Sequence, residues 1–155
     1  INKGVSGQTT VEMLSRFNED VINQNPQAVY ILAGINDIAQ NSGYISIDDI
    51  STNIIKMGLL AQKNNIKVII CSVMPVTEIA WNEKIKNANQ KVIELNQKLI
   101  NKSKKNNFIY LDYYSEMKEE LSLLTYDGLH PNEKGYLKMI AILKKSLKGI
   151  ANNFN

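Results

Sequence analysis

A single histidine lies in a segment whose residue types could support acid–base chemistry. His130 is the only histidine of the chain, and Asp127 lies three positions before it. A carboxylate at this spacing can hydrogen-bond one ring nitrogen of the imidazole and leave the other free as a general base. The same residues, Asp127-Gly128-Leu129-His130-Pro131-Asn132, also fit a turn with an exposed histidine before proline. Spacing alone favours neither interpretation.

A second segment could supply a hydrogen-bond donor to a developing negative charge. Gly34-Ile35-Asn36-Asp37 follows the apolar run 28–33, and Gly34 permits a tight exit from a strand. The side-chain amide of Asn36 could donate to an oxyanion, an effect worth about 3–4 kcal/mol in acyl transfer. The alternative is that Asn and Asp after glycine are ordinary turn residues. We assign Asp37 to that structural role, as a local cap that fixes the loop.

The first residues form a glycine-containing turn that leads into a helix. Backbone N–H groups in residues 2–10, Asn-Lys-Gly-Val-Ser-Gly-Gln-Thr-Thr, could converge on an anion. Phosphate is the obvious rival to an oxyanion as the ligand of such a turn. However, the chain has no glycine-rich loop ending in Lys followed by Ser or Thr, as nucleotide-binding loops do.

In this order, the three segments resemble conserved blocks of the SGNH (GDSL) hydrolases, a family of serine esterases and lipases. Residues 2–10 resemble the second block of the family, Gly34-Ile35-Asn36-Asp37 matches the third, G-x-N-D, and residues 127–132 match the fifth, D-x-x-H-P. The resemblance covers essentially the whole chain. The branch that it resembles contains platelet-activating-factor-acetylhydrolase-like enzymes and carbohydrate esterases.

The resemblance implies a reaction and a role for each matching residue. Asp127 and His130 would be the acid and base of a catalytic triad, while Gly7 and Asn36 would donate to the oxyanion from the backbone and the side chain. We therefore expect a carboxylic ester hydrolase that acts on a small-molecule ester of carbohydrate or lipid-like character, with an acetyl or other short acyl group. By the same resemblance, the reaction requires no metal and no other cofactor.

The chain lacks the family's first block, Gly-Asp-Ser, which carries the nucleophile. We expect that serine upstream of residue 1, together with one absent βα unit of roughly 30 residues. Ser6 is a weak substitute, because Gly4-Val5-Ser6-Gly7-Gln8 does not fit the G-x-S-x-G elbow. A base and oxyanion donors alone retain about 10³–10⁴-fold catalysis over water, so this chain by itself should be weakly active or inactive. The alternative is a non-catalytic remnant or interaction module that retains the fold.

The apolar pattern predicts the elements that would position these residues. Three short apolar runs lack the alternation of half-exposed strands, as strands buried on both faces do: residues 28–33, 67–73 and 107–111. Helical stripes between them predict an α/β fold with a mostly parallel sheet. The resemblance makes this a three-layer α/β/α, flavodoxin-like SGNH-hydrolase fold, and the chain one N-terminally truncated domain of residues 1–155.

Four helices are predicted from caps and apolar stripes. Thr9 with Glu12, and Ser46 with Asp49, form capping boxes. The third helix is predicted at about residues 82–103, and the fourth begins after Pro131 with Asn132 as its N-cap. The predicted buried stripes are, in chain order, Met13, Phe17 and Val21; Ile50, Ile54, Met57 and Ala61; Ile85, Ala88, Val92, Leu95 and Leu99; and Tyr136, Ile140, Leu143 and Leu147.

Composition narrows the class of protein further. The net charge of +3 comes from scattered lysines, without the basic stripe of a nucleic-acid-binding protein. Cys71 is the only cysteine, which excludes an internal disulfide and a cysteine-based metal site. No apolar stretch approaches the ~18 residues of a membrane span. The chain does not begin with Met, so the sequence leaves its compartment, cytoplasmic or secreted, undecided.

The family's strand order places the absent first strand centrally, between the second and third strands of the sheet. We expect its absence to leave a gap in the sheet and to expose residues 28–33 as a long apolar edge. Such an edge could pair with a second copy of the chain and form a homodimer.

Overall fold

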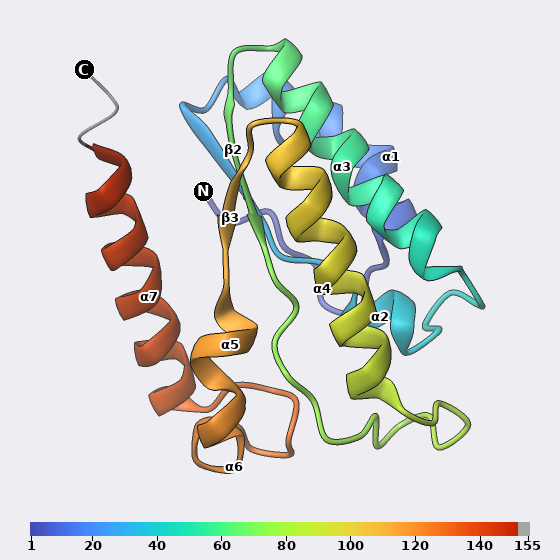
Figure 1. Cartoon of the computed structure of the whole chain (residues 1–155). Helices are drawn as coiled ribbons and strands as arrows, with labels where there is room; N and C mark the ends of the chain where they lie inside the picture. The colour runs from blue at the N-terminus through green and yellow to red at the C-terminus, as the bar shows by residue number, and fades with distance from the viewer. Residues whose placement is uncertain (152–155) are drawn as a thin grey trace.

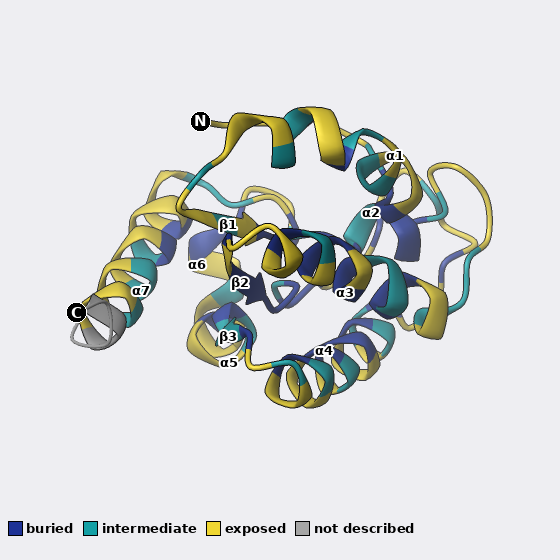
Figure 2. Ribbon diagram, turned by 90° about the horizontal axis from the view of Figure 1, so that it is seen from above, coloured by how far each residue is buried: buried dark blue, intermediate teal, exposed yellow. Residues whose placement is uncertain are grey.

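The computed structural model describes residues 1–151, and their side chains as far as residue 148. Three parallel strands form one sheet in the order β1-β2-β3, with β1 at Ala28–Ile31, β2 at Lys67–Cys71 and β3 at Ile109–Leu111. Helices cover both faces of this sheet, so that the molecule has three layers (Figures 1 and 2). The predicted α/β architecture with a parallel sheet is confirmed.

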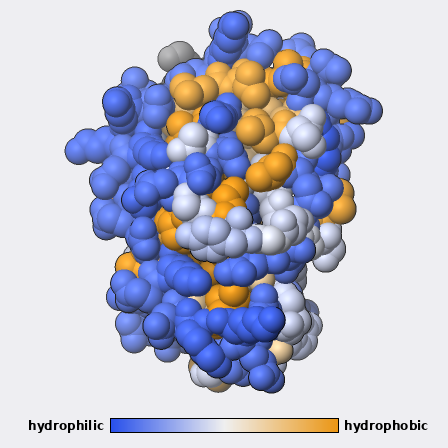
Figure 3. All heavy atoms as spheres, turned by 90° about the vertical axis from the view of Figure 1, so that its right-hand side faces the viewer, coloured by the Kyte–Doolittle hydropathy of each residue, from blue (hydrophilic) through white to orange (hydrophobic). Residues whose placement is uncertain are grey.

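Two groups of helices form the outer layers. One face carries α1 (Thr10–Asp20), α3 (Ile47–Lys63) and α4 (Ala88–Lys105), and the other carries α5 (Tyr113–Met117), α6 (Leu121–Leu124) and α7 (Glu133–Ala151). Short turns of helix complete the chain: η1 (Ile22–Gln24), α2 (Ile35–Ile38) and η2 (Lys118–Glu120). Figure 3 shows the side of α1 and α3, where apolar side chains gather within a mostly hydrophilic surface. Over residues 1–151, none of these helices has both the length and the apolar character needed to cross a membrane.

The central strand, β2, is buried on both faces. Val68 and Ile70 belong to the larger core cluster with α3 and α4, whereas Ile69 and Cys71 belong to a second cluster with α5 and α7. Because successive side chains of a strand point to opposite faces, burial of both faces requires an unbroken apolar run. The sequence interpretation of this strand is therefore confirmed.

β1 differs from β2 because it lies at the edge of the sheet. It pairs only with β2, from Ala28 opposite Lys67 to Ile31 opposite Ile70. Ala28 and Tyr30 are exposed, so the prediction that the whole run 28–33 is buried was wrong. β1 is an edge strand of the described sheet, but Ile31 and Ala33 are buried, so the predicted exposure of residues 28–33 holds only in part. The three described strands are contiguous, and the expected gap does not occur among them.

Capping groups fix the first turns of three long helices. The carboxylate of Glu12 accepts the backbone N–H of Thr9 at 2.8 Å before α1. The hydroxyl of Ser46 accepts the backbone N–H of Asp49 at 3.1 Å before α3. The side-chain oxygen of Asn132 accepts a backbone N–H of the first turn of α7 at 3.0 Å. The structure confirms the capping box of Thr9 with Glu12 and the N-caps at Ser46 and Asn132. The predicted capping box at Ser46 is only half formed, because Asp49 accepts the hydroxyl of Ser46 and not its backbone N–H.

The start of α4 was predicted too early. The helix begins at Ala88 rather than near Asn82, because Asn87 has a left-handed backbone (φ 57°) that interrupts the helical path. The side chain of Asn82 instead donates to the carbonyl of Ala39 at 2.9 Å and ties the loop before α4 to the loop after α2. The predicted stripe is nevertheless buried, from Ile85 to Leu99.

The predicted buried stripe of α7 was largely wrong. Tyr136, Ile140 and Leu147 are 57%, 47% and 38% exposed, and only Leu143 of the stripe packs against the core. α7 turns a neighbouring face inward, with Met139 buried, and packs mainly on α5 and α6. Its apolar stripe therefore has little cover from the described part of the chain, and it faces solvent beside the open edge of β1 (Figure 2).

Candidate active site

Asp127 and His130 form a hydrogen-bonded pair in the loop between α6 and α7. Oδ2 of Asp127 and Nδ1 of His130 are 2.7 Å apart. Oδ1 of Asp127 accepts the backbone N–H groups of His130 at 2.7 Å and Leu129 at 3.0 Å. The backbone bond from His130, followed by the bond from its imidazole, lowers the pKa of Asp127 to about 2. Asp127 is therefore ionised at neutral pH, and the bond to Nδ1 leaves Nε2 of His130 unused.

The segment forms both the predicted hydrogen bond to the imidazole and the predicted turn. Asp127 closes the turn through the backbone and also holds the imidazole, whose side chain is 58% exposed. Gly128 has φ +78°, and a Cβ there would lie 2.0 Å from Oγ1 of Thr77. The carbonyl of Gly128 accepts the N–H of Thr77 at 3.0 Å. The loop thus packs against the segment that follows β2, and the absence of a Cβ at Gly128 allows this close approach to Thr77.

Asn36 lies on the first turn of helix after β1, not in an open loop. Gly34 precedes it with φ +117°, a conformation that lets the chain turn sharply from β1 into α2. Nδ2 of Asn36 donates to the carbonyl of Gln8 at 2.9 Å. This bond uses one of the two hydrogens of the amide and leaves the other for a ligand. Asn36 therefore lies against the turn that contains Gly7, whose φ is +79°.

Asp37 has a structural role, but it is not the local cap that was predicted. It is 1% exposed and accepts the backbone N–H of Thr10 at 3.0 Å and the hydroxyl of Thr10 at 2.6 Å. Burial raises the pKa of Asp37, and the bonds from Thr10 oppose that effect. Asp37 thus fixes the start of α1, 27 residues away, against α2. This contact sets the turn at Gly7 beside Asn36.

A side chain that the sequence did not single out links the two halves of the site. Nδ2 of Asn41 donates to the carbonyl of Gly7 at 3.0 Å, and Oδ1 of Asn41 accepts Nε1 of Trp81 at 3.1 Å. The indole of Trp81 lies 5.7 Å, centroid to centroid, from the imidazole of His130. A continuous chain of contacts therefore joins His130 to the turn at Gly7. The two bonds of Asn41 span 34 and 40 residues, so no local pattern could have revealed them.

The serines near these loops are either exposed or bonded to groups other than His130. Ser6 is exposed on the turn before α1. The hydroxyl of Ser42 donates to Glu12, and that of Ser72 accepts the backbone N–H of Tyr114 inside the core. As far as residue 148, no hydrogen bond joins a serine hydroxyl to His130. The described residues therefore offer a base, a carboxylate and hydrogen-bond donors, without a serine placed to use them.

Comparison of the sequence with known proteins identifies the family to which the chain is similar. Residues 1–138 match the GDSL-like Lipase/Acylhydrolase family. The uncharacterized lipoprotein YqeF of Bacillus subtilis is 31% identical over 81 residues, which are 50% of this chain and 33% of that protein. An acetylxylan esterase of Xylanibacter ruminicola is 28% identical over 88 residues, which are 57% of this chain and 18% of that enzyme. The matched region is therefore a third or less of the length of these relatives.

Solved structures share the fold over nearly the whole chain. A GDSL-like lipase from Bacteroides thetaiotaomicron superposes with a TM-score of 0.91 at 40% identity, covering 96% of this chain and 75% of that one. The acetylxylan esterase Axe2 of Geobacillus stearothermophilus superposes with a TM-score of 0.81 at 20% identity, covering 94% of this chain and 70% of that enzyme. At that identity the second likeness concerns the fold alone.

Proposed function

The chain belongs to the GDSL-like lipase/acylhydrolase family, and on that basis we propose that it serves a serine-dependent hydrolysis of short-chain carboxylic esters. His130 acts as the general base, Asp127 orients it, and the N–H of Gly7 and the amide of Asn36 stabilise the oxyanion. The nucleophilic serine comes from a strand upstream of residue 1. The substrate is a small ester with an acetyl or other short acyl group.

One observation carries this proposal: the 2.7 Å bond between Asp127 and Nδ1 of His130. It selects the tautomer in which Nε2 lacks a proton and can accept one from a hydroxyl. The carboxylate that makes the bond is ionised at neutral pH, so it also stabilises the imidazolium that forms during the reaction. A base held in this way contributes about 10²–10⁴-fold to a reaction rate.

The proposed reaction has two steps, acylation of the serine and hydrolysis of the acyl-enzyme. Nε2 of His130 takes the proton of the serine hydroxyl while its oxygen attacks the ester carbonyl carbon. The resulting oxyanion accepts hydrogen bonds from Gly7 and Asn36, and His130 then returns the proton to the leaving alcohol. A water molecule repeats the sequence on the acyl-enzyme, which releases the carboxylic acid and restores the serine.

The open edge of β1 supports the proposed origin of the nucleophile. A strand added beside β1 and parallel to it would end at the same edge of the sheet as β1, where the loop of Asn36 begins. A serine at its carboxyl end would therefore enter the space next to His130. The added strand would also lie on the side of β1 where α7 leaves an apolar stripe exposed.

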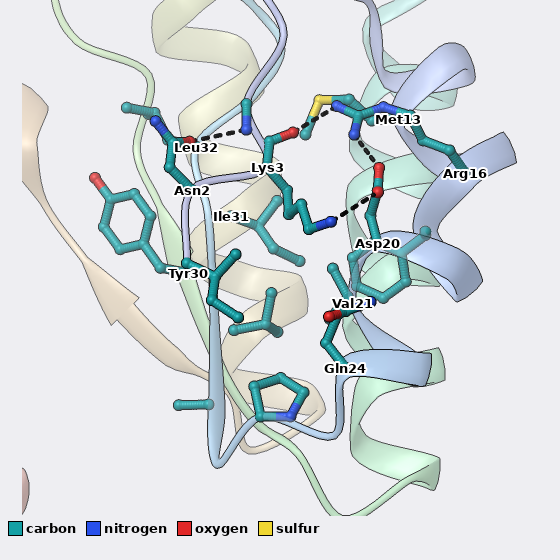
Figure 4. Close-up of a pocket in the computed structure, with 16 residues that line it drawn as sticks. Asn2, Lys3, Met13, Arg16, Asp20, Val21, Gln24, Tyr30, Ile31 and Leu32 are labelled. Carbon is teal, nitrogen blue, oxygen red and sulfur yellow. Dashed lines mark hydrogen bonds and ion pairs between the residues drawn. The ribbon is translucent and has the colours of Figure 1, made fainter.

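A groove beside β1 has the size and lining for such a strand. It has a volume of about 530 Å³, and it runs between β1 and α1 (Figure 4). Met13 and Val21 of the α1 side face Ile31 of β1 across it. The ion pair between Lys3 and Asp20, 3.5 Å apart, closes one rim of the groove. These three side chains give the groove an apolar wall, as a strand of a covered parallel sheet requires, and polar residues such as Arg16 and Gln24 also line it.

One solved esterase with the same fold has catalytic residues of the types that we propose here. Solved variants of the acetylxylan esterase of Geobacillus stearothermophilus include catalytic mutants of a serine, of an aspartate, and of a histidine three residues after that aspartate. Asp127 and His130 have the same spacing. Two relatives are acetylxylan esterases, which favours an acetyl ester as the substrate here.

The test begins with the coding sequence immediately before the codon of Ile1. If an apolar strand ending in Gly-Asp-Ser precedes it, the extended protein and the 155-residue chain are expressed separately. Both are treated with a fluorophosphonate probe and assayed with p-nitrophenyl acetate. We expect the extended protein to be labelled at one upstream serine and to hydrolyse the ester, and the 155-residue chain to remain unlabelled.

Each other outcome rejects a defined part of the proposal. Labelling of the 155-residue chain at Ser6 would show that the nucleophile was wrongly assigned. An extended protein that folds but is labelled at no serine would exclude the esterase function. A natural start codon at this point would favour a non-catalytic module of the same fold.

A further inference from the structure

The turn that contains Gly7 has little packing of its own to fix it. Residues 1–7 are all exposed, and a glycine at φ +79° has more backbone freedom than any other residue type. The direction of the Gly7 N–H therefore depends on bonds to the turn. Two side-chain amides make such bonds at consecutive carbonyls. Asn41 donates to that of Gly7 at 3.0 Å, and Asn36 donates to that of Gln8 at 2.9 Å.

The orientation of the Asn41 amide is set by its second partner, Trp81. An indole Nε1 can only donate a hydrogen bond, and a backbone carbonyl can only accept one. Trp81 therefore requires the oxygen of the amide, and the carbonyl of Gly7 requires its nitrogen, so the amide fits in one orientation. The backbone of Asn41 is also fixed, because its N–H donates to the carbonyl of Asn36 at 3.0 Å. Without the indole N–H, the amide is free to rotate away from Gly7.

Trp81 lies next to the proposed base. The planes of its indole and of the imidazole of His130 are tilted by 35°, with the centroids 5.7 Å apart. The following residue, Asn82, donates to the carbonyl of Ala39 at 2.9 Å and ties the loop of Trp81 to the end of α2. One loop therefore contacts the base through an aromatic ring and the turn of Gly7 through Asn41. The placement of Gly7 relative to His130 depends on these contacts.

We propose that Asn41 is a positioning residue for the ester hydrolysis and that Trp81 supports it, so that the N–H of Gly7 is held toward the oxyanion at a fixed place relative to His130. This inference rests on the proposed function, since it assigns a role in the oxyanion step of that reaction. Asn41 acts through Gly7 and not on the reacting atoms. An oxyanion donor is effective because it is in place before the charge develops.

The test uses substitutions in the extended protein that carries the upstream serine. Asn41→Ala removes both bonds, whereas Asn41→Asp keeps an acceptor for Trp81 and loses the donor to Gly7. We expect each to lower kcat for p-nitrophenyl acetate about 10- to 100-fold, less than the loss of a direct oxyanion donor, because the N–H of Gly7 is misplaced and not removed. KM should change less than about threefold, as for an interaction that acts in the transition state.

Trp81→Phe separates the indole N–H from the aromatic ring. Phenylalanine keeps a ring beside His130 and removes the donor to Oδ1 of Asn41. We expect a loss of kcat smaller than that of Asn41→Ala, because Asn41 can still reach Gly7 in part of its orientations. Thermal denaturation of each variant confirms that the protein remains folded.

Asn64 offers a matched control for both substitutions of Asn41. It is exposed and donates to the carbonyl of Leu60 at 2.8 Å. It lies between α3 and β2, at the amino end of the strand, whereas the site lies at the carboxyl ends. Asn64→Ala and Asn64→Asp should leave kcat unchanged. A loss of kcat with Asn41→Asp but not with Asn41→Ala would reflect the added charge and would overturn the positioning role.

The double variant tests whether the two side chains act in series. If Trp81 acts through Asn41, Trp81→Phe should lower kcat by less than about twofold once Asn41 is alanine, although it lowers kcat in the unaltered protein. A contact that only stabilises the fold does not predict this dependence. Equal losses in both backgrounds would overturn the supporting role of Trp81.

The outcomes distinguish a failed positioning role from a failed function. If the unaltered extended protein hydrolyses the ester and folded Asn41→Ala matches it in kcat, the positioning role is overturned and the esterase function stands. A rise in KM with kcat unchanged would place Asn41 in substrate binding and would also overturn the role. If the unaltered extended protein is labelled at no serine, the esterase function is excluded, and the role of Asn41 is excluded with it.

Discussion

Two aspartates at the same end of the sheet show how differently a carboxylate can be used. Asp37 is 1% exposed, and the backbone N–H and the hydroxyl of Thr10, 27 residues away, both donate to it. The side chain of Asp127 is 43% exposed, and its donors all lie within three residues. Burial raises the pKa of Asp37, whereas backbone and imidazole bonds lower that of Asp127 to about 2.

The contrast distinguishes Asp37, a carboxylate that stabilises the fold, from Asp127, a carboxylate that is accessible for a role in the reaction. Asp37 joins α1 to α2 and has no path to a ligand, because Thr10 and the surrounding core enclose it. Asp127 restrains only its own loop and a solvent-exposed imidazole. We therefore expect substitutions at Asp37 to change stability, and substitutions at Asp127 to change the reaction with little effect on stability.

The largest effect should come from Asp127→Asn in a protein that carries the nucleophile. Asparagine would hold the imidazole in the wrong tautomer, so we expect kcat to fall about 10⁴-fold. The free energy of unfolding should change by less than about 1 kcal/mol, as at most exposed positions. Hydrolysis of p-nitrophenyl acetate and urea denaturation measure the two quantities. A loss of activity below about tenfold would contradict the assigned role.

Asp37→Ala should show the opposite behaviour in the 155-residue chain. Removing the carboxylate leaves two buried donors of Thr10 without a partner, and we expect a loss of about 2–4 kcal/mol in the free energy of unfolding. Urea denaturation measures this loss, and Asp127→Ala in the same chain serves as the exposed comparison. Equal destabilisation by the two substitutions would remove the distinction between the two aspartates.

The glycines beside the two aspartates sharpen the comparison. Gly34 and Gly128 have positive φ, and a Cβ would lie 2.6 Å from Leu95 at the first and 2.0 Å from Thr77 at the second. Gly43 has φ +97° with no atom within 4 Å of such a Cβ, so Gly43→Ala measures the backbone strain alone.

We expect Gly34→Ala to cost about 1–3 kcal/mol more than Gly43→Ala, because Leu95 is a core residue with no room to move. Gly128→Ala should cost less than Gly34→Ala, since Thr77 is exposed and its side chain can rotate away. Thermal or urea denaturation of the three variants measures the differences. Equal destabilisation by Gly34→Ala and Gly43→Ala would show that close packing against Leu95 adds no cost to the backbone strain.

The smallest expected effect is on the pH dependence of the free energy of unfolding, to which Asp127 and Asp37 contribute with opposite signs. Asp127 has its pKa lowered from 3.8, so its stabilising contribution is present above 3.8 and is lost as pH falls toward about 2. Asp37 has its pKa raised, so its contribution is largest at low pH and is lost as pH rises through the raised value.

Stability measured from about pH 2 to about pH 6 should therefore change in two ways. Asp127→Asn should flatten the rise of stability in the lowest part of this range. Asp37→Asn should remove a decrease that begins above 3.8. Identical pH profiles for both variants and the unaltered chain would show that neither pKa shift exists.

Much of the site and of the secondary structure was predictable because it depends on near neighbours in the sequence. The caps at Thr9, Ser46 and Asn132, and the pairing of Asp127 with His130, all lie within three or four residues. The central strand was predictable from its unbroken apolar run. The errors have a different origin. The start of α4 depends on the backbone of one asparagine, Asn87, which residue type alone does not fix.

The sequence by itself determined the α/β class, the helix caps and the carboxylate–imidazole pair, because each arises from the periodicity of a strand or helix or from the reach of one side chain. Only the tertiary structure decided that Asp37 binds Thr10, that Asn41 joins Gly7 to Trp81, and that the apolar stripe of α7 stays exposed. Those features depend on which distant segments meet. Contacts between distant segments are determined by how the whole core packs, so no local sequence pattern predicts them.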